Sequence, residues 1–415
     1  MTDIYMVAGE PSGDRLGGSL IAALTAKRGG LAFHGVGGLD MEAAGLRSIF
    51  PMSDLTVMGL SEVVPRLPLI LQRIRETAAD IVDRRPDALV TIDAPDFCMR
   101  VAAKVRREIP DLPIIHYVAP SVWAWRSGRA KRMARHVDHV LALLPFEPPY
   151  MHAAGMSCDF VGHPVAARSR PDRNAVTEFR LARGIDSMTP LLLIAPGSRR
   201  AEVRRLTGDF AAAIDLLKSH ETGLEVVCPV AETVEEGVID WLSSLPVPVH
   251  AIRASDGAVM KTVAFAAADV ALCASGTVTL ELAAVGTPMV AAYRTTWMTA
   301  QIVRRVVKVN SANLINLISG SDAVPELLQE FCTPETLCDA VLHLLEPSAA
   351  QAQREVLDSV LVAMGRGGAP PEDRAAESVL AFLDGHRARP LLPIRSSDTD
   401  VPGPTGRHLG KRGGR

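Results

Sequence analysis

Short apolar runs alternate with longer amphipathic stretches along most of this chain, and this alternation limits its fold more than any other feature. Helical patterns such as Arg15–Lys27 and Phe97–Glu108 separate the runs. Such strand–helix alternation is typical of α/β domains with a parallel sheet. The strands we expect are Ile4–Ala8, Ala32–Val36, Ala88–Asp93, Ile114–Val118, Val137–Leu143 and Cys158–Val161, then Leu191–Ala195, Leu224–Pro229, Val247–Ile252, Val270–Ala274 and Met289–Tyr293. Because the rhythm restarts midway, we predict an α/β fold of two tandem Rossmann-like domains with an interdomain cleft.

The composition agrees with sheets that helices cover on both faces. Of the 415 residues, 48% are hydrophobic but only 4% are aromatic, so the cores must consist of Ala, Val, Leu and Ile. The formal net charge of −3 gives the whole protein no attraction to nucleic acid, although local patches can still act. We expect no nucleic-acid partner.

The cysteines and the N-terminus indicate the cellular compartment in which we expect the protein. The six cysteines are scattered, without the Cys-x-x-Cys spacing of a metal site, which is typical of buried free thiols in a reducing compartment. The N-terminus lacks the regions of a signal peptide, and no uninterrupted apolar stretch reaches the roughly 18 residues of a spanning helix. We therefore expect a cytoplasmic protein, with attachment to a membrane surface left open.

A polar segment rich in Pro and Arg, residues 162–174, separates the two halves. We predict one Rossmann-like domain over 1–165 and a second over 166–345, with the cleft between them as the default ligand site. Helices over 346–385 would follow and could pack back on the first domain. Residues 386–415 read as a disordered basic tail, with contact to anionic lipid as the alternative.

The loop Ala8–Asp14 follows the first predicted strand and precedes a helix. Its small residues let a ligand approach the backbone, and Glu10, Ser12 and Asp14 supply polar groups. The loop is not Gly-x-Gly-x-x-Gly, and no acidic residue ends the second strand, so a dinucleotide is disfavoured. The alternative interpretation is a tight turn that Ser12 or Asp14 caps.

Two carboxylates follow the strand Ala88–Ile92. Asp93 is expected at the carboxyl end of a parallel strand, where ligands bind in such sheets. Partial burial there would raise the pKa of the carboxyl towards the range useful to a base. Asp96 could serve instead, but capping the helix that begins near Phe97 is the better interpretation.

Residues 116–126 hold two of the four tryptophans of the chain, Trp123 and Trp125, next to Arg126. After a strand, these side chains would line the cleft and stack on a sugar or shelter an acyl chain. A basic run follows, either an exposed helix face or a contact with phosphate or anionic lipid: Arg129, Lys131, Arg132 and Arg135.

Two loops of the second half have the character of phosphate sites. Gly197, Ser198 and Arg199 follow its first strand, where backbone N–H groups and a guanidinium suit a pyrophosphate. A second strand leads into a helix through Ser275, Gly276 and Thr277, and Glu281 one turn later could bind ribose hydroxyls or merely favour the helix dipole. Two such loops in one domain indicate a nucleotide diphosphate.

The sequence offers no metal clamp for that diphosphate. The only Asp-x-Asp pair, Asp398 and Asp400, lies in the predicted tail. We expect neither metal nor cofactor, so backbone N–H groups, helix ends and Arg must stabilise a leaving diphosphate.

Together these segments resemble the lipid-A-disaccharide synthases, inverting glycosyltransferases with the two-domain glycosyltransferase-B fold. The similarity extends from the first strand to about residue 340. Asp93–Phe97 and Ser121–Arg126 are highly specific as a set. Further matching stretches are Ala8–Asp14, Val57–Val63 with Glu62, Leu144–Glu147, Val161–His163, Pro196–Arg199, Ala274–Thr277 with Glu281, and Asn316.

The resemblance implies transfer of a sugar from UDP-2,3-diacylglucosamine to 2,3-diacylglucosamine 1-phosphate, which releases UDP and forms a β-1,6-linked disaccharide. It implies that Asp93 is the general base, that Arg199 serves the nucleotide, and that Glu281 and Asn316 lie beside UDP. It also implies a peripheral protein on the inner face of the cytoplasmic membrane. Cys98 replaces the usual Asn and Ile315 the common Pro, which puts the fine positioning of the site in question.

Other interpretations stay open at this point. A UDP-sugar epimerase would process the donor without an acceptor, another UDP-sugar glycosyltransferase would use a different acceptor, and a nucleotide sensor would release no UDP. The apolar stretch 57–81, with Leu67, Leu69 and Leu71, is either a core helix or a lip that rests on the inner leaflet. A homodimer is also left open.

Overall fold

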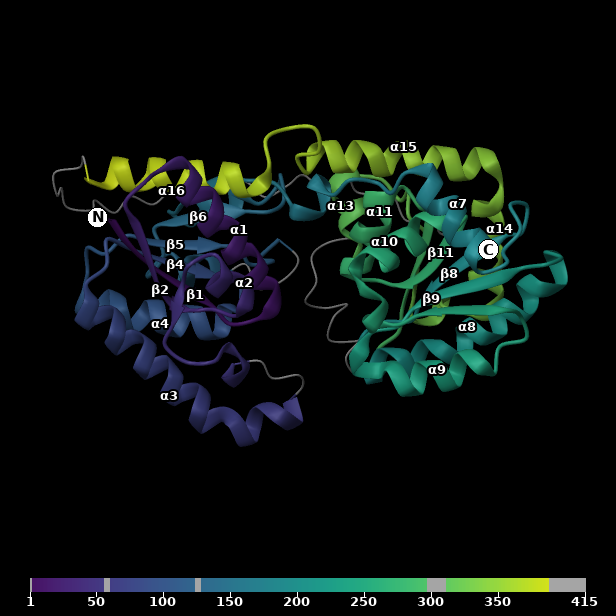
Figure 1. Cartoon of the computed structure of the whole chain (residues 1–415), viewed down its shortest axis with the longest axis horizontal. Coiled ribbons are helices and arrows are strands. Elements are labelled where there is room, and N and C mark those ends of the chain that lie inside the picture. Colours follow the sequence, from purple (N-terminus) through teal and green to yellow (C-terminus); the bar gives the residue numbers. More distant parts are fainter. Residues whose placement is uncertain (1, 56–59, 124–127, 297–310, 388–415) are drawn as a thin grey trace, which may run out of the picture.

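The computed structural model describes residues 2–55, 60–123, 128–296 and 311–387. These residues form two α/β units, each with a parallel sheet between layers of helices (Figure 1). The predicted fold class is confirmed.

The first sheet contains seven strands in the order β3-β2-β1-β4-β5-β6-β7. Every pairing in it is parallel, and the central strands are buried almost completely, as their mostly apolar sequences require. The strands are β1 (Thr2–Ala8), β2 (Leu31–Val36), β3 (Arg47–Ser48), β4 (Ala88–Ile92), β5 (Ile114–Tyr117), β6 (His139–Ala142) and β7 (Ser157–Phe160). The helices are α1 (Pro11–Lys27), α2 (Leu39–Ala43), α3 (Leu60–Arg84), α4 (Pro95–Glu108), α5 (Gly128–Met133) and α6 (Pro148–His152).

The second sheet contains six parallel strands in the order β10-β9-β8-β11-β12-β13. They are β8 (Leu191–Ala195), β9 (Glu225–Pro229), β10 (Val249–Ile252), β11 (Val270–Ala274), β12 (Met289–Tyr293) and β13 (Glu326–Leu328). The helices are α7 (Arg173–Ala182), α8 (Arg200–His220), α9 (Glu235–Ser243), α10 (Gly257–Ala267), α11 (Thr277–Val285), α13 (Leu314–Ser319) and α14 (Pro334–Leu345). Short 3-10 turns, among them Pro164–Ala167, join these elements.

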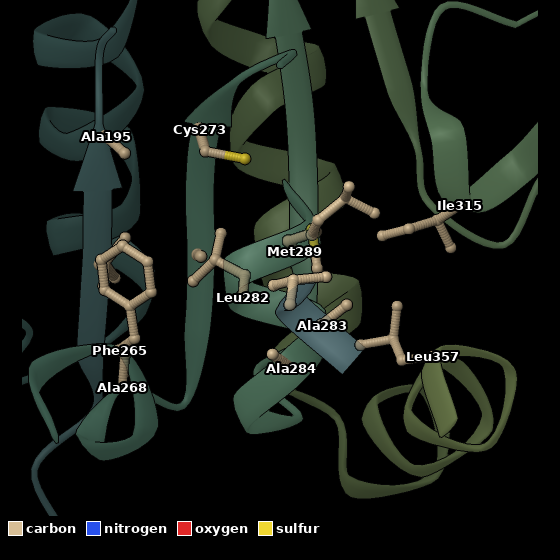
Figure 2. Packing of buried hydrophobic residues seen from close by; sticks show 14 of the residues in the cluster. Ala195, Phe265, Ala268, Cys273, Leu282, Ala283, Ala284, Met289, Ile315 and Leu357 are labelled. Carbon is tan, nitrogen blue, oxygen red and sulfur yellow. The ribbon is translucent and has the colours of Figure 1, made fainter. Parts of the chain in front are cut away.

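The second core shows how a chain poor in aromatics fills its interior. Alanines and aliphatic side chains make up most of this cluster, and Figure 2 shows them around the buried ring of Phe265. Ile315, which replaces the Pro that the resemblance led us to expect, is fully buried in this cluster with Met289 and Leu357. The substitution therefore fills core volume.

The last two helices lie on different units. Helix α15 (Pro347–Ala363) packs on the second, and α16 (Pro371–Arg387) runs back along the first (Figure 1). Helix α16 places Val379 and Leu383 in the core beneath α1, and Arg28 pairs with Asp384 at 2.5 Å. The first sheet is thus covered partly by the C-terminal end of the described chain.

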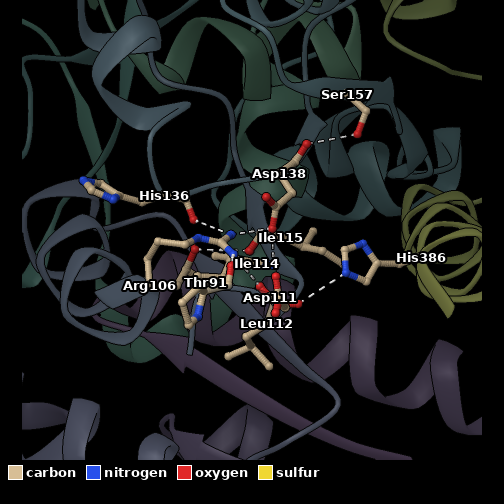
Figure 3. A network of polar contacts seen from close by, with 11 residues as sticks. Thr91, Arg106, Asp111, Leu112, Ile114, Ile115, His136, Asp138, Ser157 and His386 are labelled. Carbon is tan, nitrogen blue, oxygen red and sulfur yellow. Dashed lines mark hydrogen bonds and ion pairs between the residues drawn. The ribbon is translucent and has the colours of Figure 1, made fainter. Parts of the chain in front are cut away.

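A polar network fixes the amino-terminal edge of the first sheet (Figure 3). Arg106 on α4 pairs with Asp138 at 2.5 Å, and Asp138 also accepts a hydrogen bond from the backbone N–H of Ile114 at 2.8 Å. His386 on α16 binds the carbonyl oxygen of Asp111 at 3.3 Å. The opposite, carboxyl-terminal edge is left to the loops that carry the candidate site.

Among the helices of the described residues, none combines the length and apolar character needed to cross a membrane.

Candidate active site

Each sheet has a point where the strand order reverses direction, between β1 and β4 in the first and between β8 and β11 in the second. In open parallel sheets, ligands bind beyond the carboxyl ends of the strands at this point. The loops after these four strands carry Glu10 and Ser12, Asp93, Gly197–Arg199, and Ser275–Thr277. The candidate residues of both halves therefore occupy the expected positions of two facing sites.

The turn after β4 has an unusual backbone. Asp93 and Ala94 have φ values of 50° and 40°, in the left-handed region that only Gly, Asn and Asp adopt readily. A Cβ added to Gly9 would lie 2.8 Å from the Cβ of Ala94, so the first loop needs glycine to pack against this turn. Cys98 is buried below, with Sγ 3.9 Å from the carbonyl oxygen of Ile92. The two loops hold each other in place.

This packing brings three polar groups together around Asp93. The hydroxyl of Ser12 donates to Oδ2 of Asp93 at 3.2 Å. Partial burial and then the charge of Asp93 raise the pKa of Glu10, while the positive charge of Arg199 lowers it. Since Arg199 belongs to the second unit, its influence on Glu10 puts the nucleotide loop within electrostatic reach of the Asp93 loop.

Asp14 makes several hydrogen bonds within the first unit. Its carboxylate is buried and accepts hydrogen bonds from the backbone N–H groups of Gly38 at 2.7 Å, Asp40 at 3.0 Å and Met41 at 3.1 Å. It thus stabilises the start of α2, and its predicted place among the cleft residues stays a prediction. Neither Asp14 nor Ser12 caps α1, whose N-cap is Glu10, without a side-chain bond.

Asp96 also departs from its prediction. Helix α4 begins at Pro95 with Ala94 as its N-cap, and no side chain caps it. The Asp96 side chain is 98% exposed and lies 3.8 Å from Arg129. The predicted cap is therefore wrong, and the carboxylate faces solvent in the first turn.

The tryptophan segment begins beside the Asp93 turn, because the backbone N–H of Asp93 bonds to the carbonyl oxygen of Tyr117 at 2.9 Å. Val118, the next residue, has a φ of 82°, which is strained for a β-branched side chain. Trp123 is half-buried and packs edge-on against Phe146. Trp125 and Arg126 lie outside the described residues, and of Glu62 only the place of its backbone on α3 is described.

A cavity of about 630 Å³ lies at the carboxyl ends of β8 and β11. Gly197, Ser198 and Arg199 form one wall, and Ser275, Gly276 and Thr277 form another at the N-terminus of α11. Gly197 has a φ of 115°, and a Cβ there would meet Glu202 Oε2 at 2.9 Å. The predicted phosphate loops thus face one space, where backbone N–H groups and a helix N-terminus favour an anion.

Glu281 lines the same cavity and is held between two cations. Lys261 Nζ lies 2.7 Å from one of its oxygens and Arg168 Nη1 lies 3.2 Å from the other. Lys261 and Arg253 also line the cavity, and the sequence interpretation missed both. Both lie well before α11 in the sequence and belong to none of the predicted motifs, so only the fold brings them to the site.

Asn316, which the resemblance places beside UDP, makes several hydrogen bonds within the second unit. Its amide donates to the carbonyl oxygen of Val324 at 2.8 Å and to Glu326 at 3.3 Å, and it accepts from the backbone N–H of Val324 at 2.9 Å. It is buried and is not among the described residues that line the cavity. Its amide joins α13 to the segment before β13, and its place beside UDP stays a prediction.

Two histidines near the predicted motifs, the buried His116 and the half-buried His163, have lowered pKa values. Burial lowers the pKa of His116 to about 4, and its Nδ1 lies 2.8 Å from the hydroxyl of Thr91. Burial, and then the charge of Arg168, lowers the pKa of His163 to about 4. Within the described residues, no three His, Cys, Asp or Glu side chains gather as metal ligands would.

Comparison with known proteins places this architecture in a family. A sequence profile described as "Lipid-A-disaccharide synthetase" matches residues 4–371. A protein of Rhodospirillum centenum named lipid-A-disaccharide synthase is 49% identical over 386 residues, which cover 92% of this chain and 94% of the relative. A protein of the same name from Ruegeria pomeroyi is 47% identical over 390 residues, covering 92% and 96%.

Solved structures share the fold at low sequence identity. The UDP-GlcNAc 2-epimerase of Neisseria meningitidis bound to UDP-GlcNAc has a TM-score of 0.59 and 12% identity, covering 93% of this chain and all of that one. MurG of Acinetobacter baumannii has a TM-score of 0.53 and 15% identity, with coverages of 93% and 100%. These likenesses show the fold alone, whereas the full-length profile and the close relatives show that the chain belongs to the lipid-A-disaccharide synthetase family.

Proposed function

We propose that this chain transfers diacylglucosamine from its UDP-linked form to diacylglucosamine 1-phosphate, with Asp93 as the general base. The activity follows from membership in the family. The roles that we give to individual residues rest on their positions on the two sides of the gap between the units. Asp93 ends β4 of the first unit, while the cavity of the second unit is lined by Arg199 and the N-terminus of α11.

The reaction is a single displacement. The Asp93 carboxylate takes the proton of the acceptor 6-hydroxyl as that oxygen forms a bond to the anomeric carbon of the donor. The bond from that carbon to the phosphate oxygen breaks on the opposite face, and its electron pair leaves with UDP. The anomeric configuration is inverted, and the proton on Asp93 passes to solvent after product release.

The second unit binds and stabilises UDP. Ser198 and the N-terminus of α11 offer N–H groups to the diphosphate, and Arg199 adds a positive charge as negative charge develops on the leaving oxygen. Glu281, oriented by Lys261, is placed to bind a ribose hydroxyl. These groups provide charge stabilisation without a metal, and we expect EDTA to leave the rate unchanged.

Two connections join the units and would allow them to close. The segment from Gly162 to Arg168 touches the turn between α15 and α16, where the backbone N–H of His163 bonds to Met364 at 3.1 Å. Gly162 and Gly365, one on each connection, have positive φ values of 92° and 109°. Rotation here would bring donor and base together and exclude water.

The acyl chains of both substrates imply contact with the inner leaflet. On α3, Leu67 is 43% exposed beside the exposed Arg66, and Leu69 is half-buried. Leu71 packs against the first core, so the predicted lip includes Leu67 and Leu69 but not Leu71. An apolar edge flanked by arginine suits an anionic membrane surface.

One assay tests the reaction. The purified chain is incubated with both monosaccharide lipids in mixed micelles, and UDP and disaccharide are measured together. We expect equal amounts of both, and only when donor and acceptor are present. Conversion of the donor alone would instead indicate an epimerase, and binding of UDP without turnover would indicate a sensor.

A further inference from the structure

The loop between β6 and α6 contains a buried carboxylate that the proposed chemistry does not use. Glu147 is only 3% exposed. Burial raises the pKa of Glu147 to about 7, although hydrogen bonds from the backbone of Leu144 and the indole of Trp123 oppose this rise. Among the described residues no cation pairs with Glu147, and a buried carboxyl group is costly, so its presence calls for a reason beyond packing.

The contacts of Glu147 point to one neighbour. Its Oε2 accepts a hydrogen bond from the backbone N–H of Leu144 at 3.0 Å, which fixes the carboxylate to its own loop. Its Oε1 accepts from the indole N–H of Trp123 at 3.4 Å. The Trp123 ring also meets the ring of Phe146 edge-on, with centroids 5.2 Å apart and planes at 86°. Trp123 is thus held by one short loop, both at its indole N–H and through its ring.

Trp123 connects the segment beside Asp93 with the junction of the two units. It belongs to the segment that leaves β5 beside Asp93, through the strained residue Val118. Trp123 and Phe146 pack against the large cluster of the second unit, which also includes Val165 and Ala166 of the connecting segment. A shift of Trp123 would therefore change both the wall beside the base and the junction between the units.

We propose that Glu147 is a positioning residue for the acceptor: through Trp123 it holds residues 118–123, the described part of the segment after β5, in register with Asp93 and with the domain junction. This inference rests on the proposed function, because it assumes that this segment lines the acceptor side. The nucleotide cavity lies in the other unit, and Glu147 is not among the described residues that line it. The effect of Glu147 is therefore specific to one substrate.

The variant Glu147→Gln tests the proposal with little change in volume. Gln has one acceptor oxygen where Glu has two, so either Leu144 N–H or the Trp123 indole must face an NH₂ group and lose its bond. We expect the KM for the acceptor to rise about tenfold, with the KM for the donor and the Kd for UDP changing less than about twofold. Glu108→Gln, at an exposed position of the same unit, is the matched control and should match the wild type.

The variant Trp123→Phe keeps the aromatic ring and removes only the N–H donor. We expect the same rise in acceptor KM, and the double variant should show little more than either single change, because both remove one interaction. Trp241→Phe, in α9 of the second unit, controls for loss of an indole.

Three results would overturn the inference. They are an unchanged acceptor KM in Glu147→Gln, an equal rise in both substrate KM values, or fully additive effects in the double variant. A loss of thermal stability with unchanged kinetics would show a purely structural role and would also overturn it. Absence of disaccharide from the wild type itself would instead reject the proposed function, so the two failures are distinguishable.

Discussion

At the residue scale, the proposed base depends on a backbone conformation that few residues accept. Asp93 and Ala94 both have positive φ, and the Ser12 hydroxyl and the close approach of Gly9 stabilise the turn. Asp tolerates this conformation better than most residues, and Asn tolerates it equally well. Asn is therefore the substitution that removes the base and keeps the geometry.

For Asp93→Asn, we predict a fall in kcat of about a thousandfold with substrate KM values nearly unchanged, because the amide does not take the acceptor proton. Steady-state kinetics of UDP release would measure this, with the melting temperature as a check on folding. Asp83→Asn, at an exposed position at the end of α3, is the control. Near-wild-type turnover in a folded Asp93→Asn protein would show that another group is the base.

Arg199 is a surface residue whose contribution should be to binding and not to stability. It is 81% exposed and pairs with Glu202 at 3.1 Å, and exposed pairs of this kind contribute little to folding. We predict that Arg199→Ala weakens UDP binding by about ten- to a hundredfold in calorimetry, because a charged bond to the diphosphate is lost. Arg173→Ala, exposed on the same unit, should bind like the wild type. An unchanged Kd for Arg199→Ala would remove this residue from the nucleotide site.

Glu147 makes a pH-dependent contribution to stability. Its pKa is raised from 4.5 to about 7, so the folded state holds a proton that the unfolded state releases between these values. The stability it contributes is complete below pH 4.5 and is lost as the pH rises through about 7. Gln cannot ionise. We therefore predict that the free energy of unfolding of Glu147→Gln, relative to that of the wild type, is most favourable above pH 7. Urea unfolding at pH 5 and pH 8 would measure this. If the free energies of unfolding of variant and wild type differed by the same amount at both pH values, the prediction would be contradicted.

Motifs continuous in sequence could be predicted at this scale, and side chains brought together by the fold could not. Gly197–Arg199 and Ser275–Thr277 each follow one strand, so their positions were predictable from the strand ends. Lys261 and Glu147 act through partners 20 and 24 residues away and carry no local pattern. Asn316 was assigned by resemblance, and no local pattern reveals that its amide is fully used within the fold.

At the element scale, burial on both faces made most strands easy to predict. The central strands are continuous apolar runs, and each predicted run overlaps an observed strand. The two strands that were missed, β3 and β13, lie at the edges of their sheets and have only two and three residues. Edge strands are covered on fewer sides, so their sequences lack the apolar signal.

Helix α3 is the element on which the membrane proposal depends. Its inner face packs through Ile74, Ala78 and Ile81, and Leu67 faces outward. We predict that Leu67→Ser with Leu69→Ser reduces binding to vesicles of anionic phospholipid several-fold, because apolar area is removed from the bilayer contact. Vesicle sedimentation measures this, and turnover in detergent micelles should be retained.

The control for this change is Leu181→Ser. Leu181 is 71% exposed on α7 of the second unit, so its removal changes surface hydrophobicity without touching α3. Equal vesicle binding by the wild type and the α3 variant would contradict the proposed lip.

At the scale of the whole molecule, the chain ties its two units together twice. The first connection follows β7, and the second joins α15 to α16, which returns to cover α1. Arg366, on the second connection, donates to the carbonyl oxygen of Ala166 on the first at 3.2 Å and to that of Ala284 on α11 at 2.7 Å. A pair of adjacent connections restricts the relative motion of the units to a hinge, which suits a site that must close over two substrates.

The return of α16 makes the stability of the first unit depend on residues more than 350 positions from α1. Leu383 is 3% exposed in the core beneath α1, and Lys27 and Arg28 bind Glu377 and Asp384 across the same contact. Ion pairs this exposed contribute little, so the apolar contact should dominate. We predict that Leu383→Ala destabilises the protein by about 2–4 kcal/mol. Val362→Ala, at an exposed position of α15, should destabilise the protein much less.

If α16 belongs to the cooperative unit of the first sheet, hydrogen exchange in α1 will accelerate in Leu383→Ala while exchange in α8 does not. Unaltered exchange in α1 would show that α16 only rests on the surface of the first unit.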